Sequence, residues 1–208
     1  MLLKEIATLQ AGVLTNRVLY DARSGDKKDT AEKKRERSYE KIRILIPKAI
    51  HDGAVDHSLI EEQELIIDPR TGEAKDVTDF RTRIGDIIIK LSSPYDACVI
   101  TERDAGLLIP SFCLRIVVKE AKIDRDFLLA FFSSTVFLGE LRKKCYGTVM
   151  ALAKKSDFEK IDIPDIPLGK QIEIGRRFRK VETLKSQVRK YCSLERERLD
   201  RILEAEEC

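Results

Sequence analysis

The sequence predicts a mixed α/β (α+β) domain over residues 1–166, followed by one long coiled-coil helix over residues 167–208. Three observations lead to this fold class. Short β-prone runs separated by turn residues fill the N-terminal half, and apolar residues then recur at helical spacing. Two prolines finally precede an unbroken helical pattern. At 208 residues the chain has room for one ordinary domain and an appendage.

The N-terminal half is predicted to be a series of strands. The β-prone runs are KIRILIPKAI, ELIID, RIGDIIIKL, ACVI and SFCLRIVVK. Turns are expected at HDGAVD and DPRTGEAKD, and Gly106 and Pro110 mark two more. RIGDIIIKL opens with a Gly-Asp turn and should continue as a buried strand.

The segment KIDRDFLLAFFSSTVFLGELRKK changes to the helical period, with Asp124 as a candidate N-cap. Its apolar residues at helical spacing are Phe127, Leu128, Phe131, Phe132, Leu138 and Leu141. Ser156 and Glu159 have the spacing of a capping box, which predicts a short helix. The IDIP run that follows should be extended.

The last 40 residues carry one apolar stripe, which we expect to be a dimerisation face. Its positions are Ile174, Phe178, Val181, Leu184, Val188, Tyr191, Leu194, Leu199 and Ile202. Their mean spacing of about 3.5 residues is the coiled-coil period rather than that of a straight helix. The alternative is a helix packed on its own domain, but a helix of about 58 Å outreaches a small domain.

Charge along this helix favours antiparallel pairing. Residues 168–190 hold eight basic and two acidic residues, whereas residues 191–208 hold three basic and six acidic. An antiparallel pair lays each basic half on an acidic half. Pro164 and Pro167 fix their own φ angles and push Asp165 and Ile166 toward extended geometry. The joint before the helix should therefore be stiff.

Composition limits the function classes. The net charge is +3, so any nucleic-acid role must come from local patches. The longest apolar run, Phe127 to Phe132, is too short to span a bilayer, and Lys4 and Glu5 interrupt any signal peptide. Five scattered cysteines without a CxxC pair indicate idle thiols in a reducing compartment. We expect a cytoplasmic protein without a membrane partner.

Motifs that imitate catalytic chemistry are weak. Asp68, Glu73 and Lys75 imitate a metal-dependent nuclease triplet, but they lie in a polar turn rather than on a rigid strand. SSPYD faintly resembles an amino-methyltransferase motif, yet no glycine-rich turn accompanies it. His51 and His57 sit in a turn without a nucleophile signature. We expect no catalytic residue, metal or cofactor.

Two basic segments are candidates for DNA binding. The first contains Lys33, Lys34, Arg35 and Arg37 in a run of eight basic and five acidic residues. The second, RKKCYGTVMALAKK, contains Arg142, Lys143, Lys144, Tyr146, Gly147, Thr148, Lys154 and Lys155. Cations for phosphates beside short polar and aromatic side chains for base edges are typical of a DNA-reading loop. The alternatives are solubility charge and helix C-terminal cations.

Several segments together resemble a known family. LKEIATLQAG, RIGDIIIKL, GTVMALAKKSDFEKIDIP and PLGKQIEI are similar, in order and spacing, to target-recognition domains of specificity subunits in type I restriction-modification systems. The last fits the pattern Pro-Leu-x-x-Gln-x-x-Ile with Pro167, Leu168, Gln171 and Ile174. The chain departs from the family at Lys170, where an acidic residue is usual. It also has one domain and one helix where a full subunit has two of each.

The resemblance implies a half-subunit without chemistry of its own. In the family, each α/β domain reads one half of an interrupted double-stranded DNA site. The long helices pair antiparallel and dock the modification subunits, which methylate adenine; restriction subunits join for cleavage. This chain would then act as a homodimer. Two alternatives remain open: a coiled-coil adaptor that binds protein, and a nuclease that uses Asp68, Glu73 and Lys75.

Overall fold

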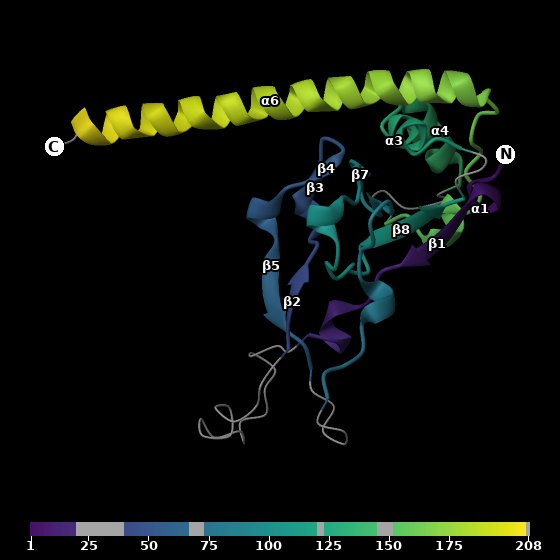
Figure 1. Cartoon of the computed structure of the whole chain (residues 1–208), viewed down its shortest axis with the longest axis horizontal. Helices are drawn as coiled ribbons and strands as arrows, with labels where there is room; N and C mark the ends of the chain where they lie inside the picture. The colour runs from purple at the N-terminus through teal and green to yellow at the C-terminus, as the bar shows by residue number, and fades with distance from the viewer. Residues whose placement is uncertain (20–39, 67–72, 120–122, 145–151, 207–208) are drawn as a thin grey trace.

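The computed structural model describes residues 1–19, 40–66, 73–119, 123–144 and 152–206. Its main sheet has four antiparallel strands in the order β1-β8-β6-β7; Figure 1 labels β1, β8 and β7 of this sheet. The strands are β1 Ala7–Ala11, β6 Ile87–Lys90, β7 Ala97–Val99 and β8 Cys113–Val118. β8 is central, because Ile116 pairs with Leu9 on one side and with Ile87 on the other.

Both faces of this sheet are covered, which explains why β6 is apolar. Ile87 and Ile89 belong to a core cluster that includes Phe127 of the helical layer, whereas Ile88 belongs to a second cluster with Cys98. Successive strand residues point to opposite faces, so a doubly covered strand is a continuous apolar run. The buried strand predicted after the Gly-Asp turn is therefore confirmed.

A buried ion pair ties that turn to the central strand. Asp86 and Arg115 are 4% and 6% exposed. Arg115 donates from Nε to Asp86 Oδ2 at 2.6 Å and from Nη2 to Oδ1 at 3.2 Å. The backbone N–H of Arg83 also donates to Asp86, at 2.8 Å. Buried charges are tolerated when they are paired and hydrogen-bonded, so this carboxylate locks the turn onto β8.

Two small antiparallel sheets lie beside the main one. β2 Lys41–Ile44 pairs with β5 Glu61–Glu64, and β3 Ile50–His51 forms a hairpin with β4 Ala54–Val55. The strand predicted at ELIID starts earlier than expected: β5 ends at Glu64, Leu65 forms an isolated bridge with Leu19, and residues 67 and 68 lie outside the described residues. Opposite β2 the sequence is EEQE; Lys41 lies across from Glu64, and its amine forms a diagonal ion pair with Glu62 at 3.1 Å. Ladder pairing and charge, rather than apolar character, set this strand.

The helical layer contains α1 Leu3–Ile6, α3 Arg125–Phe132, α4 Thr135–Lys144 and α5 Lys155–Phe158. Asp124 caps α3 as predicted, since its Oδ1 accepts from Phe127 N at 2.8 Å. Ser134 separates α3 from α4 by donating to Phe131 O at 2.6 Å, so the expected single helical run is two helices. Short 3₁₀ turns occur at Thr15–Arg17, Pro47–Ala49, His57–Leu59, Thr78–Phe80 and Glu102–Asp104.

The predicted capping box at Ser156 is wrong by two residues. The N-cap of α5 is Lys154, whose backbone N–H donates to the Asp157 carboxylate at 2.8 Å. A carboxylate three residues after the cap satisfies the exposed N–H as well as Glu159 would have done. Ser156 therefore lies inside the helix.

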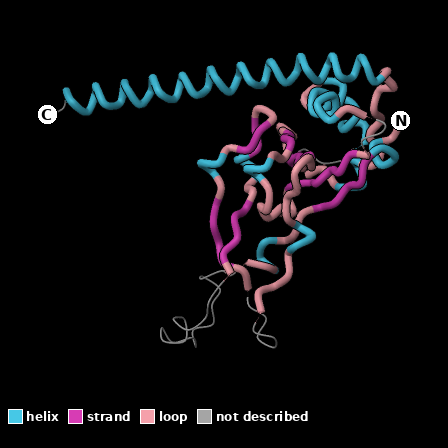
Figure 2. The backbone as a smooth tube through the Cα atoms, viewed as in Figure 1, coloured by secondary structure: helices cyan, strands magenta, loops and turns pink. Residues whose placement is uncertain are grey.

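The chain ends in α6 Leu168–Glu206, 39 residues and about 58 Å long, as predicted. It begins directly after Pro167, crosses the domain beside α3, and extends past the domain toward the C-terminus (Figures 1 and 2). None of the described helices has the length and apolar character that a membrane crossing requires.

Candidate nucleic-acid interface and helical pairing surface

α6 is anchored to the domain through a close approach to α3. Gly175 makes this possible, because a Cβ there would lie 2.6 Å from Asp124 Oδ1 and 2.9 Å from Phe127 N. Ile174 and Phe178 on either side pack against the main core cluster. These two members of the predicted dimerisation stripe are thus used within the chain, and the alternative of a helix packed on its own domain holds for this segment.

Gln171 fastens the start of the helix. It is 3% exposed. Its Oε1 accepts from the backbone N–H of Asp124 at 2.9 Å, and its Nε2 donates to Ile166 O at 2.7 Å. One side chain thus joins α6, the N-terminus of α3 and the extended joint. This gives a physical reason for glutamine at the third fixed position of the Pro-Leu-x-x-Gln pattern.

Charged contacts continue the anchoring along the helix. Arg179 forms an ion pair with Asp126 on α3, and this hydrogen bond raises the pKa of the guanidinium above its ordinary value. Glu182, 9% exposed, accepts from Lys185 at 2.6 Å. Beside it lies Gly53 of the β3–β4 hairpin: a Cβ added there would be 3.6 Å from Glu182 Cγ. The side of α6 that faces the domain is therefore polar beyond Phe178.

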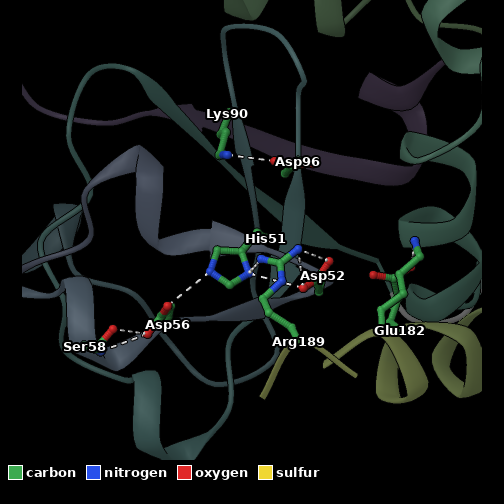
Figure 3. Close-up of polar contacts among 9 residues, drawn as sticks. His51, Asp52, Asp56, Ser58, Lys90, Asp96, Glu182 and Arg189 are labelled. Carbon is green, nitrogen blue, oxygen red and sulfur yellow. Dashed lines mark hydrogen bonds and ion pairs between the residues drawn. The ribbon is translucent and has the colours of Figure 1, made fainter. Parts of the chain in front are cut away.

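The β3–β4 hairpin makes the last of these contacts, which the sequence did not indicate. Arg189 reaches Asp52 Oδ2 at 2.8 Å and His51 Nδ1 at 2.8 Å, and His51 Nε2 lies 3.2 Å from Asp56 (Figure 3). Asp52 turns the hairpin at φ 51°. The hydroxyl of Ser58, hydrogen-bonded to Asp56, lowers the pKa of that carboxyl. The hairpin thus contacts α6 at Arg189, which lies about 21 Å along the helix from Gly175 at 1.5 Å per residue.

Most of the predicted stripe is exposed. The exposed fractions range from 45% to 64% for Val181, Leu184, Val188, Tyr191, Leu194, Leu199 and Ile202. Leu203, which the spacing argument missed, is 65% exposed. Consecutive helix residues differ by about 100° in direction. Val181 and Val188 each precede a residue that lies against the domain, Glu182 and Arg189, so they point to the flank of α6 rather than at the domain. Leu184, three residues after Val181, lies on the same flank.

The second basic segment begins at the end of α4 and ends in α5, two helices in contact. Lys143 donates to Glu140 at 2.6 Å, Lys144 lies 4.0 Å from Asp162, and Lys155 lies 3.5 Å from Glu159. Arg142 and Lys154 are exposed. The fold therefore brings both basic ends of the segment together. Glu140 raises the pKa of Lys143, so this amine stays cationic.

Other predicted DNA-binding residues lie outside the described residues. They are Lys33, Lys34, Arg35, Arg37, Tyr146, Gly147 and Thr148. For them the sequence prediction stands as a prediction.

Among the described residues, the motifs that imitate catalytic chemistry do not form a catalytic arrangement. Lys75 donates to the carbonyl of Arg17 at 3.2 Å, Glu73 is exposed, and Asp68 lies outside the described residues. Within the described ranges no three His, Cys, Asp or Glu side chains gather as metal ligands. His57 lies 2.7 Å from Asp104, so both histidines have carboxylate partners. Burial raises the pKa of the Cys113 thiol to about 12, which makes it unreactive.

Comparison with known proteins identifies the fold. No family model and no curated protein match the sequence. The HsdS subunit from Thermoanaerobacter tengcongensis superposes with a TM-score of 0.52 and 19% identity, over 92% of this chain and 45% of that one. This chain has the HsdS fold. A structure described as showing complex assembly and conformational transition of the type I R-M system gives a TM-score of 0.53 and 18% identity, with the same coverage.

The HsdS likeness confirms the predicted fold class, an α/β domain with a long C-terminal helix, and it agrees with the family resemblance drawn from the sequence. The chain spans 45% of the length of both HsdS-like structures. It therefore corresponds in extent to about half of each of them.

Proposed function

We propose that this chain is a sequence-specific DNA-binding specificity subunit of a type I restriction-modification system, and that it works as a homodimer. The observation that carries the proposal is the HsdS fold over 92% of the chain. HsdS proteins are the specificity subunits of these systems. The α/β domain, residues 1–166, would recognise the DNA target, and residues 167–208 would form the dimerisation helix.

A second copy would add a second domain and a second long helix. The chain matches 45% of an HsdS subunit, so two copies provide two domains and two long helices. The exposed side chains of Val181, Leu184 and Val188 offer an apolar surface for pairing. The basic first half and acidic second half of α6 favour the antiparallel arrangement. Each domain would then stand at one end of a shared rod.

This arrangement determines the form of the DNA target. Two identical domains related by a two-fold axis read the same half-site in opposite orientations, so the target is an inverted repeat. If most of the rod of about 58 Å separates the domains, the gap is several base pairs, up to about fifteen at 3.4 Å each. The methyltransferase subunits, and restriction subunits where present, would dock on the paired helices and supply all the chemistry.

The basic ends of α4 and α5 would hold the DNA backbone. Lys143, Lys144, Lys154 and Lys155 would contact phosphates, with Arg142 beside them. Tyr146, Gly147 and Thr148 of the same segment would read bases. Lys33, Lys34, Arg35 and Arg37 form the second predicted contact. Phosphate contacts place the protein on the duplex, and base contacts give specificity.

DNA retention at low salt tests the proposal. Binding to a random-sequence duplex is measured between about 50 and 200 mM salt, with wild type and with K143A/K144A/K154A/K155A. The quadruple variant should bind all sequences more weakly, and the slope of log affinity against log salt should flatten by about 0.9 for each phosphate that is no longer neutralised. The matched control, K4A/K41A/K48A/K170A, removes four exposed lysines elsewhere and should behave as wild type.

Three outcomes separate the possibilities. A quadruple variant with unchanged affinity would exclude this patch as the phosphate-binding surface. A wild-type chain that shows no DNA retention even at the lowest salt would contradict the proposed function and support the adaptor alternative. Cleavage of DNA on addition of a divalent metal would support the nuclease alternative.

A further inference from the structure

The exposed flank of α6 carries a regular apolar surface. Val181, Val188, Glu195 and Ile202 are seven residues apart and lie in one row, while Leu184 and Tyr191 form the row beside it. Leu199 adjoins the first row, one helical turn from both Glu195 and Ile202. We call this surface the free flank. It is apolar except at Glu195 and at Arg198, which continues the row of Leu184 and Tyr191 and donates to Glu195 at 2.7 Å.

The free flank borders a groove that is closed on one side by the domain. The groove is lined by Asp52 of the β3–β4 hairpin and, along the helix, by Val181, Leu184, Lys185, Val188, Arg189 and Cys192. Arg189 holds Asp52 in place at 2.8 Å. The wall and floor of the groove are therefore fixed relative to each other before any partner arrives.

We infer that this groove seats the α6 helix of a second copy in one register, whose centre lies between Tyr191 and Cys192. An antiparallel stripe that packs on its own copy must be symmetric about its midpoint. The free flank runs from Val181 to Ile202, which fixes that midpoint. Val181 then lies opposite Ile202 of the second copy, and Leu184 lies opposite Leu199.

Charge selects the same register. Opposite Val188 the second copy places Glu195, the acidic residue on the free flank. Its neighbours on the facing helix are Lys185 and Arg189, three residues before and one residue after Val188. Lys185 donates to Glu182 of its own helix at 2.6 Å, and because its side chain is 55% exposed it can also meet a partner on this side. Glu195, already paired with Arg198 of its own helix, thereby gains two cations from the facing helix, and the two-fold axis repeats this arrangement at a second place.

Other occupants fit the groove less well. An unrelated helix would have to reproduce both the apolar spacing and an acid at one position, whereas the second copy carries both. The overlap of residues 181–202 is about 33 Å long, three heptads, and leaves the docked start of each helix outside the interface. This inference rests on the proposed homodimer, and it adds which residues of the two copies meet.

A charge exchange tests the register in the full chain by analytical ultracentrifugation. E195K should weaken the dimer by at least about tenfold, since at each of two places it sets the new lysine beside Arg198 of its own helix and Lys185 and Arg189 of the facing helix. K185E/E195K restores opposite charges and should recover most of the affinity. The matched control is E197K, an equal charge change two residues on and about 200° around the helix, which should leave the dimer intact. A double variant no better than E195K would overturn the register.

Distances between spin labels test it independently. In a C145S/C208S background, labels at Cys192 should lie about 1.5 Å apart along the rod and be strongly coupled. Labels at position 203, in C145S/C192S/C208S/L203C, should be about 35 Å apart along the rod. Short distances at both positions mean a parallel pair and overturn the inference, as does a monomer. A confirmed register in a chain that retains no DNA would contradict the DNA-binding role alone.

Discussion

The apolar stripe of α6 begins in contact with the domain and ends exposed to solvent. In residues 168–189 the helix is held by Gln171, Gly175, Phe178 and Arg189, all in contact with the domain. In residues 190–206 the apolar side chains are exposed, as Tyr191 at 64% shows. A row repeating every 3.5 residues drifts about 20° per heptad around a helix of 3.6 residues per turn. The stripe that begins under the domain therefore moves onto the free flank.

Because of this drift, one helix can both dock on its own domain and offer an apolar surface to a partner. A strict 3.6 period would have kept the apolar row against the domain, and a docked helix would have had nothing to offer a partner. With the 3.5 period, Ile174 and Phe178 stabilise the domain, and Val188 and Ile202 are left for pairing. Polar residues replace apolar ones on the domain side beyond Phe178, where Glu182 and Arg189 make the contacts.

The largest expected effect comes from charging the free flank. V181D/V188D removes four buried valines from the dimer, at about 1.5 kcal/mol or more each, so the dissociation constant should rise at least about a thousandfold. The chain should remain folded, because both valines are exposed in one copy. Light scattering should report monomers, whereas T183D/K190D, on the opposite side of the helix, should report dimers. A dimer in both would place the interface elsewhere.

The second effect concerns the domain that holds the docked part. D86N removes the buried charge that faces Arg115, and we expect a loss of about 3–5 kcal/mol in the free energy of unfolding. E62Q removes an exposed partner of Lys41 and should cost under about 1 kcal/mol. Urea denaturation followed by circular dichroism compares the two. Equal losses would show that the buried pair contributes no more than a surface one.

A smaller effect separates docking from helix propensity. G175A places a Cβ within 2.9 Å of three atoms of the α3 N-terminus, so the helices must separate, at a cost of about 1–3 kcal/mol. G169A meets nothing within 4 Å and should stabilise the chain by a few tenths up to about 1 kcal/mol. Thermal unfolding of both should give shifts of opposite sign. A stabilised G175A would mean that α6 does not approach α3 as closely as described.

The smallest effect is on the hairpin grip. R189A removes the contacts to Asp52 and His51, and because the guanidinium is half exposed, the unfolding free energy should fall by under about 1 kcal/mol. The sharper readout is geometric: spin labels at S58C and S193C, in a C145S/C192S/C208S background, should show a broader distance distribution in R189A. Q187A, about 160° around the helix from Arg189, should leave it narrow. If the width of the distance distribution is unchanged in R189A, the contacts with α3 alone fix the orientation of the domain on α6.

The sequence was sufficient for the elements with strong local patterns. IIIK after Gly85 and Asp86 could be predicted as a buried strand, and Asp124 as a cap, because local chemistry decides both. The limits of α6 followed from Pro167 and an uninterrupted period. The strand EEQE could not be found, since its pairing with Lys41–Ile44 is a long-range event.

The candidate surfaces were predictable in part. The apolar spacing identified Val181 and Val188, but it could not tell that Phe178 belongs to the domain, since burial depends on what lies nearby. Arg189 gave no signal, because its partners Asp52 and His51 are distant in sequence. Asp86 could have been suspected from its place after a glycine turn, whereas Arg115 looked out of place in a strand until its partner was known.

We propose that two copies hold two DNA-reading domains at a distance set by α6. Selection of bound sequences from a random pool, with the modification subunits present, tests it in wild type and in a variant lacking Tyr191–Glu197. That heptad lies beyond Arg189 and its hairpin partners, and its loss brings the domains about 10 Å closer. We predict an inverted repeat with unchanged half-sites and a gap about three base pairs shorter in the variant. An asymmetric target, or a gap indifferent to the deletion, would contradict the account.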